Sequence, residues 1–514
     1  MSSRRTVMNR LLEQIRHLRP VLVFVALSLC LWGQDDSTQG QSPTGAPPAA
    51  TGGEGEPSVE NPPLSSLDRP RFEPAFGGRS YLLPGFQVSE TAYSSASSGT
   101  NSGVSATTQG LGSVDLQKIF KRYSVGLDYI GGGSVYTGPT VNGQGRGYQV
   151  HTLALDQRIP WQTGQLAIRD SFDYLPEGSF GYGSFGGAGG TGLLGNGGVG
   201  VGTGLGGGLS GGSPAGLFSG TGFGSLGFQP RIDNLSMVDV IQQLSPRNSV
   251  TLAAGYDFSD YLNKSNSKFP VINSEQTTLQ AGYNHLLNRK DQIGVLYAFQ
   301  EIHFPQANSG SVDVHVWNVL YGHRITGRLN LVVGGGPQVL EIHSPATTIL
   351  LLGIFPIQIP ASTTRTISGN GTVTVGYIVS SRTNAQLLYQ HYVTPGSGFV
   401  AGANTDAARA SLSHTFRRLW TGEVDFGYSH NSTLRNASAT AGINARGYQF
   451  WYGGGSLRRQ LGPHFSAYMS YQLNDFGATS CSSSSGSQAV CGQTFRSHTG
   501  QIGISWHPHP IRLD

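Results

Sequence analysis

Charged residues are scarce in this chain: Asp, Glu, Lys and Arg make up 12% of its 514 residues, roughly half the share usual in soluble domains. Hydrophobic residues reach only 37%, which argues against a bundle of membrane-spanning helices. The formal net charge of +4 is too small for a chain of this length to indicate nucleic-acid binding. Glycine (75 residues) and aromatic residues (10%) are present instead. This composition fits strands with one apolar face and one small or polar face.

The N-terminal region lacks an apolar run long enough to form a membrane-spanning helix. Five arginines precede an uncharged apolar run at residues 21–32, which is shorter than the ~20 residues of a spanning helix. A basic segment followed by a short apolar core is typical of a signal peptide, which we predict at residues 1–33. Residues 34–83 are rich in Pro, Gly, Ser and Thr and are predicted to be a disordered periplasmic linker. The sequence leaves open whether this linker hangs in the periplasm or threads into a pore.

Cysteine is rare as well, with three residues in the chain. Cys30 lies within the predicted signal peptide, so Cys481 and Cys491 remain after processing. Because a signal peptide implies an oxidising compartment, we expect these two to form a loop disulfide. In the chain-entropy model, a loop this short stabilises the fold by roughly 3 kcal/mol. No His, Asp or Glu lies between the two cysteines, which argues against a metal site.

Alternating apolar and polar residues recur from residue 84 to residue 506. In the closing segment 497–506, Ile502, Ile504 and Trp506 fall on one face, and small or polar residues fall on the other. Successive side chains of a strand point to opposite sides, so a two-residue period predicts strands and not helices.

Short turns and longer loops alternate along the same region. Each pair of consecutive short turns encloses two strand-like segments that are joined by a longer loop. This alternation is typical of barrels with short periplasmic turns and long extracellular loops. It predicts an all-β, antiparallel up-and-down transmembrane β-barrel of about 18 strands, with about 16 as an open alternative. The short turns are predicted near residues 121–123, 159–164, 245–248, 288–291, 326–328, 380–383, 417–419 and 460–463.

Over residues 84–506 the chain resembles bacterial outer-membrane β-barrels of the porin-like kind. The resemblance rests on the signal peptide, strand parity, loop asymmetry and aromatic-terminated last strand, and not on a family-specific motif. It implies an outer-membrane location, contact with outer-membrane lipid and insertion by the barrel-assembly machinery, and it leaves a homo-oligomer open. Such barrels usually end on the terminal aromatic residue, whereas here a tail of residues 507–514 follows Trp506.

Charged residues of both signs fall on the predicted lumen face. Opposite charges that face each other across a pore set a transverse field that orients polar solutes; the alternative is that they are ordinary hydrated residues of a water-filled barrel. The candidate pore-lining residues are Asp128, Arg169, Asp173, Asp257, Arg409, Glu423 and Asp425.

Two loops without charged residues could affect access to the lumen. The glycine-rich insert at residues 178–230 contains no Asp, Glu, Lys or Arg, and is either a mobile surface loop or a segment that folds into the lumen and narrows it. The apolar loop at residues 347–360 is expected to cover the mouth or to lie against the outer leaflet.

The sequence does not indicate an enzyme, a metal site or a cofactor site. His430 lies near two serines and Asp425, but no spacing here is diagnostic of a catalytic triad. We therefore interpret the chain as a porin-like channel for the diffusion or uptake of small polar solutes. The alternatives are an export barrel for a surface polysaccharide, and a structural or adhesive barrel with a plugged lumen.

Overall fold

The computed structural model describes most of the predicted barrel. The signal peptide at residues 1–33, the glycine-rich insert at residues 178–230 and Cys491 lie outside the described residues, as does most of the predicted linker. The described residues are 63–65, 79–97, 104–137, 147–175, 231–262, 272–305, 310–351, 355–395, 402–417, 419–434, 445–481 and 494–513.

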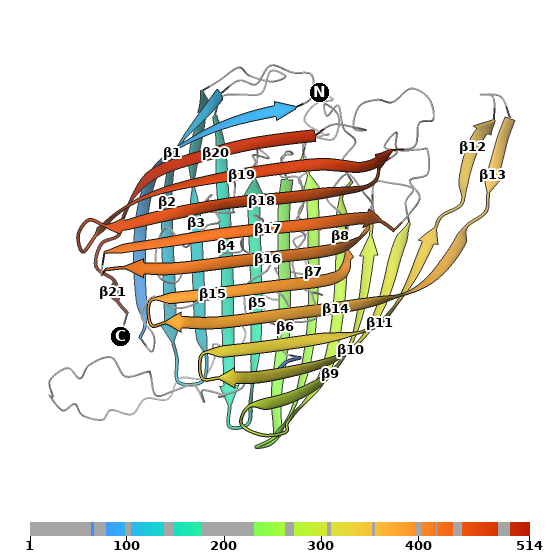
Figure 1. The fold of residues 1–514 in the computed structure, drawn as a ribbon, viewed down its shortest axis with the longest axis horizontal. Coiled ribbons are helices and arrows are strands. Elements are labelled where there is room, and N and C mark those ends of the chain that lie inside the picture. Colours follow the sequence, from blue (N-terminus) through green and yellow to red (C-terminus); the bar gives the residue numbers. More distant parts are fainter. Residues whose placement is uncertain are drawn as a thin grey trace, which may run out of the picture. The chain divides into compact units, whose positions relative to one another are not determined.

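Eighteen long strands form the wall of the barrel (Figure 1). The chain runs up and down through them in sequence order. The strands are β1 (Tyr81–Ser97), β2 (Val104–Ile119), β3 (Ser124–Thr137), β4 (Gly147–Trp161), β5 (Gly164–Leu175), β6 (Arg231–Ser245), β7 (Asn248–Tyr261), β8 (Ser274–Leu286), β9 (Asp291–His303), β10 (Ser311–Thr326), β11 (Leu329–Ser344), β14 (Ser362–Ser380), β15 (Thr383–Thr394), β16 (Ala403–Phe416), β17 (Trp420–Thr433), β18 (Ala445–Gln460), β19 (Phe465–Cys481) and β20 (Thr494–Trp506).

The barrel is closed by the pairing of its last strand with its first. β20 pairs antiparallel with β1, from Phe86 opposite Trp506 to Ser97 opposite Phe495. All other neighbours are also antiparallel, and this leaves the wall without an open edge. The prediction of an all-β barrel with 18 strands is confirmed, and the 16-strand alternative is wrong because β1 and β2 pair regularly along their length. A short strand, β21 (Ile511–Arg512), pairs with the start of β1 within the predicted tail.

Side chains alternate between an exposed apolar outer face and a buried, mostly polar inner face. On β20, Ile502 and Ile504 are 61% and 53% exposed, whereas Gln501 and Ser505 are 7% and 0% exposed. β8 and β9 repeat the pattern, with outward residues such as Leu279 and inward residues such as Gln280. An apolar outer surface on a closed barrel suits contact with lipid, because the backbone polar groups of the wall pair between neighbouring strands.

Short turns gather at one end of the barrel, here named the short-turn end. Tight turns occupy residues 162–163, 246–247, 327–328 and 381–382, at predicted positions. At the other end, the long-loop end, the apolar loop that was predicted to cover the mouth or to lie against the outer leaflet contains a separate two-stranded hairpin. Its strands are β12 (Thr347–Leu351) and β13 (Phe355–Ile359), and it continues outward from β11 and β14 (Figure 1). Among the described residues, no helix is long and apolar enough to cross a membrane.

The outward position of Ile504 generates a test of the assigned faces. Ile504→Arg is expected to destabilise the barrel by about 2–4 kcal/mol, because the charge would face hydrocarbon. Gln501→Arg on the same strand places the same charge on the inner face and is expected to cost clearly less. Urea unfolding, with heat-modifiable migration on a gel as the check of assembly, compares the two variants. A larger loss for Gln501→Arg would mean that the two faces are exchanged.

Candidate functional site

The inner wall carries the candidate pore-lining residues. Asp128, Asp257 and Asp425 are at most 8% exposed and alternate with less buried apolar residues of the outer face. Glu423 shares the face of Asp425, two positions away on β17. Asp173 lies in β5, where its backbone is opposite Thr152 and Asp233, but its side chain is outside the described part of the structure.

Three predicted residues come together on β16 and β17: Arg409, Glu423 and Asp425. The Arg409 guanidinium donates to Asp425 through Nε, at 3.1 Å from Oδ1 and 2.8 Å from Oδ2, and also through Nη2. Asp425 is 1% exposed and the Arg409 side chain 13% exposed. Such a side-on arginine–carboxylate contact fixes both side chains against the wall.

Tyr452 completes this cluster from β18 and was missed at the sequence level. Its hydroxyl donates to Asp425 Oδ1 at 2.6 Å, and its ring lies over Gly427, where an added Cβ would be 2.1 Å from Tyr452 Cε1. Arg409, Gly427 and Tyr452 are opposite one another in the register of the three strands. The position of Tyr452 on the inner face follows from alternation, but its meeting with Asp425 depends on strand register, which the sequence did not give.

Arg169 forms a second ion pair on β5 and β6. Its Nη2 lies 2.8 Å from Asp239 Oδ1, and both side chains are 4% exposed. On β4, Arg158 donates to Asp156 through Nη2 at 2.8 Å. Asp239, Asp156 and Arg158 were not among the predicted site residues, although their parity along each strand places them on the inner face.

Arg169 and Arg409 lie on opposite walls. In either direction around the closed barrel, eight strands separate β5 from β16. Each arginine contacts an aspartate of its own wall, Asp239 in one case and Asp425 in the other. Both arginines are therefore held in local pairs along the wall.

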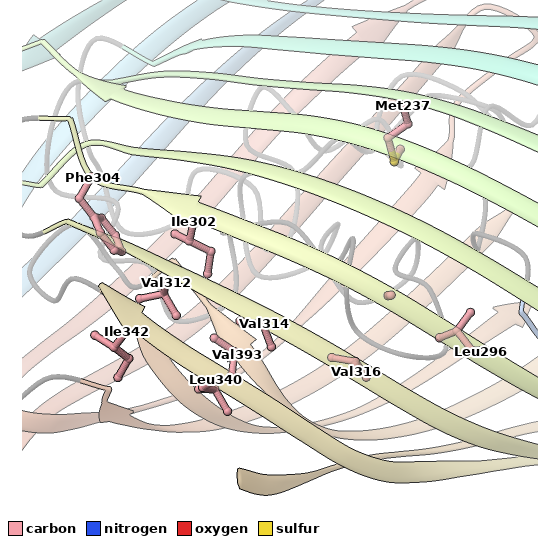
Figure 2. Packing of buried hydrophobic residues seen from close by; sticks show 11 residues of the cluster. Met237, Leu296, Ile302, Phe304, Val312, Val314, Val316, Leu340, Ile342 and Val393 are labelled. Carbon is pink, nitrogen blue, oxygen red and sulfur yellow. The ribbon is translucent and has the colours of Figure 1, made fainter. Parts of the chain in front are cut away.

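Toward the long-loop end, β9, β10 and β11 carry apolar side chains on the inner face (Figure 2). Ile302, Val312 and Ile342 are opposite one another across the three strands, and Val314 is opposite Leu340. All are at most 8% exposed. The cluster, here named the inner apolar patch, comprises Met237, Leu296, Ala298, Ile302, Phe304, Val312, Val314, Val316, Leu340, Ile342 and Val393.

Toward the long-loop end, where the inner face is apolar, the outer face becomes polar. Between the inward valines of β10 lie Asp313 and His315, whereas Trp317, Val319 and Tyr321 face outward further along the strand. The Tyr297 hydroxyl is 2.9 Å from His315 Nδ1, and its ring is tilted against that of Trp317, with 5.5 Å between the ring centroids. Aromatic residues at this boundary are typical of the membrane interface. The wall of β9–β11 thus continues beyond the lipid, and there it buries apolar side chains inward as a soluble protein does.

His507 follows β20 at the short-turn end, outside the strands. Burial and the nearby positive charge of Arg458 lower the pKa of His507 to about 4. Its Nδ1 lies 2.8 Å from the position of a Cβ added at Gly85, so the ring rests against the first strand. At neutral pH this ring is uncharged and adds no positive charge to the wall.

The buried pair of Arg409 and Asp425 generates a stability prediction. Asp425→Ala removes the carboxylate that the guanidinium contacts and is expected to destabilise the barrel by about 3 kcal/mol. Glu341→Ala is the control, because its partner Arg365 is 65% exposed and such a pair contributes about 1 kcal/mol or less. Urea unfolding measures both losses. Equal losses would show that the Arg409–Asp425 pair behaves as a hydrated surface pair.

No family model matches the sequence, and no curated protein shows significant similarity to it. Among solved structures, the chain is similar to Acinetobacter baumannii OccAB4, with 9% identity, a TM-score of 0.39, and coverage of 85% of this chain and 100% of that one. Pseudomonas aeruginosa OpdK, solved with vanillate, matches with 11% identity and a TM-score of 0.38 over 83% of this chain and 99% of that one. P. aeruginosa OpdQ matches with 9% identity and a TM-score of 0.37 over 83% and 99%. By its own closed 18-strand wall, apolar outer face and polar inner face, the protein is an outer-membrane β-barrel of porin-like architecture.

Proposed function

We propose that the barrel is a channel for small polar solutes across the outer membrane. The observation that carries this proposal is the inner wall, where amide, hydroxyl and charged side chains replace the apolar residues of the outer face. A barrel of this strand number is wide enough to hold an aqueous path. Polar side chains along such a path substitute for part of the hydration of a passing solute.

The charge of the inner face favours cations over anions. The buried charged residues of the described chain are Arg169 and six aspartates, Asp128, Asp156, Asp233, Asp239, Asp257 and Asp425. Arg158, Arg409 and Glu423 are partly exposed on the same face. Acidic groups thus outnumber basic ones along the described wall, and a negative wall raises the local concentration of cations.

A second function, a structural or adhesive barrel with a filled lumen, is favoured by the inner apolar patch. Side chains such as Val312 and Leu340 are 0% and 3% exposed on the inner face, which does not suit a wide aqueous path along β9–β11. In this alternative the hairpin β12–β13 and the long loops would supply the contacts with other surfaces. An export role for a polysaccharide is not favoured by any described feature.

Conductance distinguishes the channel from the filled barrel. We expect the purified protein to give discrete conductance steps in a planar lipid bilayer. A variant without residues 178–230 shows whether the glycine-rich insert limits the conductance. Absence of steps from both proteins, when both migrate as folded barrels, would exclude the channel and favour the filled barrel.

Ion selectivity tests the role of the inner aspartates. Under a salt gradient, the reversal potential is expected to show a preference for cations. The double variant Asp128→Asn, Asp257→Asn is expected to reduce this cation preference by about two-fold. Glu301→Gln is the matched control, because Glu301 is exposed on the outer face of β9. An equal change in the control and the double variant would contradict the assignment.

A further inference from the structure

Residues 63–65, which precede the first strand, lie against the inner wall of β7, β8, β9 and β10. Leu64 is 9% exposed and Ser65 is 0% exposed. Their partners Thr251, Gln280 and Asn284 belong to the inner face. A piece of the N-terminal segment therefore occupies part of the lumen.

Every hydrogen-bonding group of Ser65 is satisfied by the wall. Its backbone N–H donates to Asn284 Oδ1 at 3.0 Å, and its Oγ accepts from Asn284 Nδ2 at 2.5 Å. Its carbonyl oxygen accepts from Gln280 Nε2 at 2.6 Å and from Thr251 Oγ1 at 3.2 Å. Since the Thr251 proton is used on that carbonyl, the Ser65 hydroxyl donates in the remaining 2.6 Å contact with Thr251 Oγ1.

Three glycines on adjacent strands make room for the segment. A Cβ added at Gly282 on β8 would lie 2.3 Å from the Ser65 side chain. One added at Gly294 on β9 would lie 3.5 Å from Leu64 Cβ, and one at Gly322 on β10 would lie 2.9 Å from Leu64 Cδ2. Any larger residue at Gly282 or Gly322 would occupy space that the segment now fills.

The three glycines and the three polar partners form one site, here named the Leu-Ser site. It lies toward the short-turn end, because Asn284 and Gly322 are close to the last residues of β8 and β10, where the short turns follow. The start of β1 is also at this end, on the far side of the barrel from β9 and β10. The Leu-Ser site and the start of β1 are therefore on opposite walls of the barrel.

We propose that residues 63–65 are an internal plug that the Leu-Ser site binds at the short-turn mouth of the lumen. Binding is specified by the hydroxyl and backbone of Ser65 and by the fit of Leu64 over Gly294 and Gly322. The effect on solute passage rests on the proposed channel function, whereas occupancy of the site does not. The occupied site narrows the path from the side of β7–β10, opposite the pairing of β1 with β20.

Disulfide trapping tests occupancy of the Leu-Ser site without reference to transport. In a full-length background with all native cysteines changed to serine, the pair Ser65→Cys, Thr251→Cys is expected to cross-link after mild oxidation, with loss of both thiols to alkylation until a reductant is added. The control pair is Ser65→Cys, Ser429→Cys, because Ser429 is equally buried on the inner face but on β17. No cross-link in the first pair, or equal cross-linking in both, would overturn the proposed site.

Single-channel conductance tests the plug. Gly282→Leu is expected to displace the segment and to raise the conductance about two-fold, because the narrowest part of a path limits its conductance. Gly376→Leu is the matched control: Gly376 is on the inner face of β14 at a similar distance from the short-turn end, with no atom within 4 Å of an added Cβ. Heat-modifiable migration verifies that both variants form barrels.

The two experiments separate failure of the plug from failure of the channel. A cross-link at Thr251 with equal conductance in Gly282→Leu, Gly376→Leu and the parent would keep the Leu-Ser site but overturn its role as a plug. A cross-link in proteins that never conduct would retain the site and overturn the channel function. A cross-link together with a conductance increase confined to Gly282→Leu supports both.

Discussion

The pairing of β20 with β1 is the contact on which the rest of this structure depends, because lipid offers no partner for an unpaired backbone N–H or C=O. From Phe86 opposite Trp506 to Ser97 opposite Phe495, this pairing turns a sheet into a closed wall. Closure also fixes which face of every strand is inside. Ile502 and Ile504 then face lipid, and Gln501 and Ser505 face the lumen. The inner charges, the inner apolar patch and the Leu-Ser site all exist as sites only because the wall is closed.

The inner face has polar and apolar regions, which differ in position both along the barrel axis and around it. Ion pairs such as Arg409–Asp425 lie within the lipid-facing part of the wall, where the outer residues Val424 and Phe426 are apolar. Toward the long-loop end of β9–β11, polar residues face outward and Val312 and Ile342 face inward. One sheet thus serves as a membrane wall over part of its length and as the shell of a small apolar core over the rest. Strand length beyond the lipid makes this exchange of faces possible.

The N-terminal segment and the inner apolar patch both reduce the space that water can occupy. The polar groups of Ser65 are satisfied by hydrogen bonds to inward side chains of the wall. The polar side chains on the rest of the inner wall define where a solute can pass. A channel function and a partly filled lumen are therefore compatible properties of the same barrel.

The fold could be predicted from the sequence because its determinants are local. A two-residue period assigns the faces of each strand, and turn residues such as 245–248 mark where strands end. The even strand number and the closing role of 497–506 follow from the alternation of turns and loops. Alternation also placed Asp128, Arg169 and Asp425 on the inner face. It did not predict that the apolar loop at residues 347–360 contains the hairpin β12–β13.

By itself, the sequence determined that this chain is a closed, amphipathic barrel, because lipid and water select opposite residue types at alternate positions. Only the tertiary structure decided which inner residues meet. Register between strands joins Arg169 to Asp239 and brings Tyr452 over Gly427 to Asp425, and no local pattern encodes that register. The Leu-Ser site was equally hidden, because Ser65 meets Thr251 and Asn284 across more than 180 positions of chain. Its glycines leave space for Leu64 and Ser65, and this role is visible only when three strands and a distant segment are brought together.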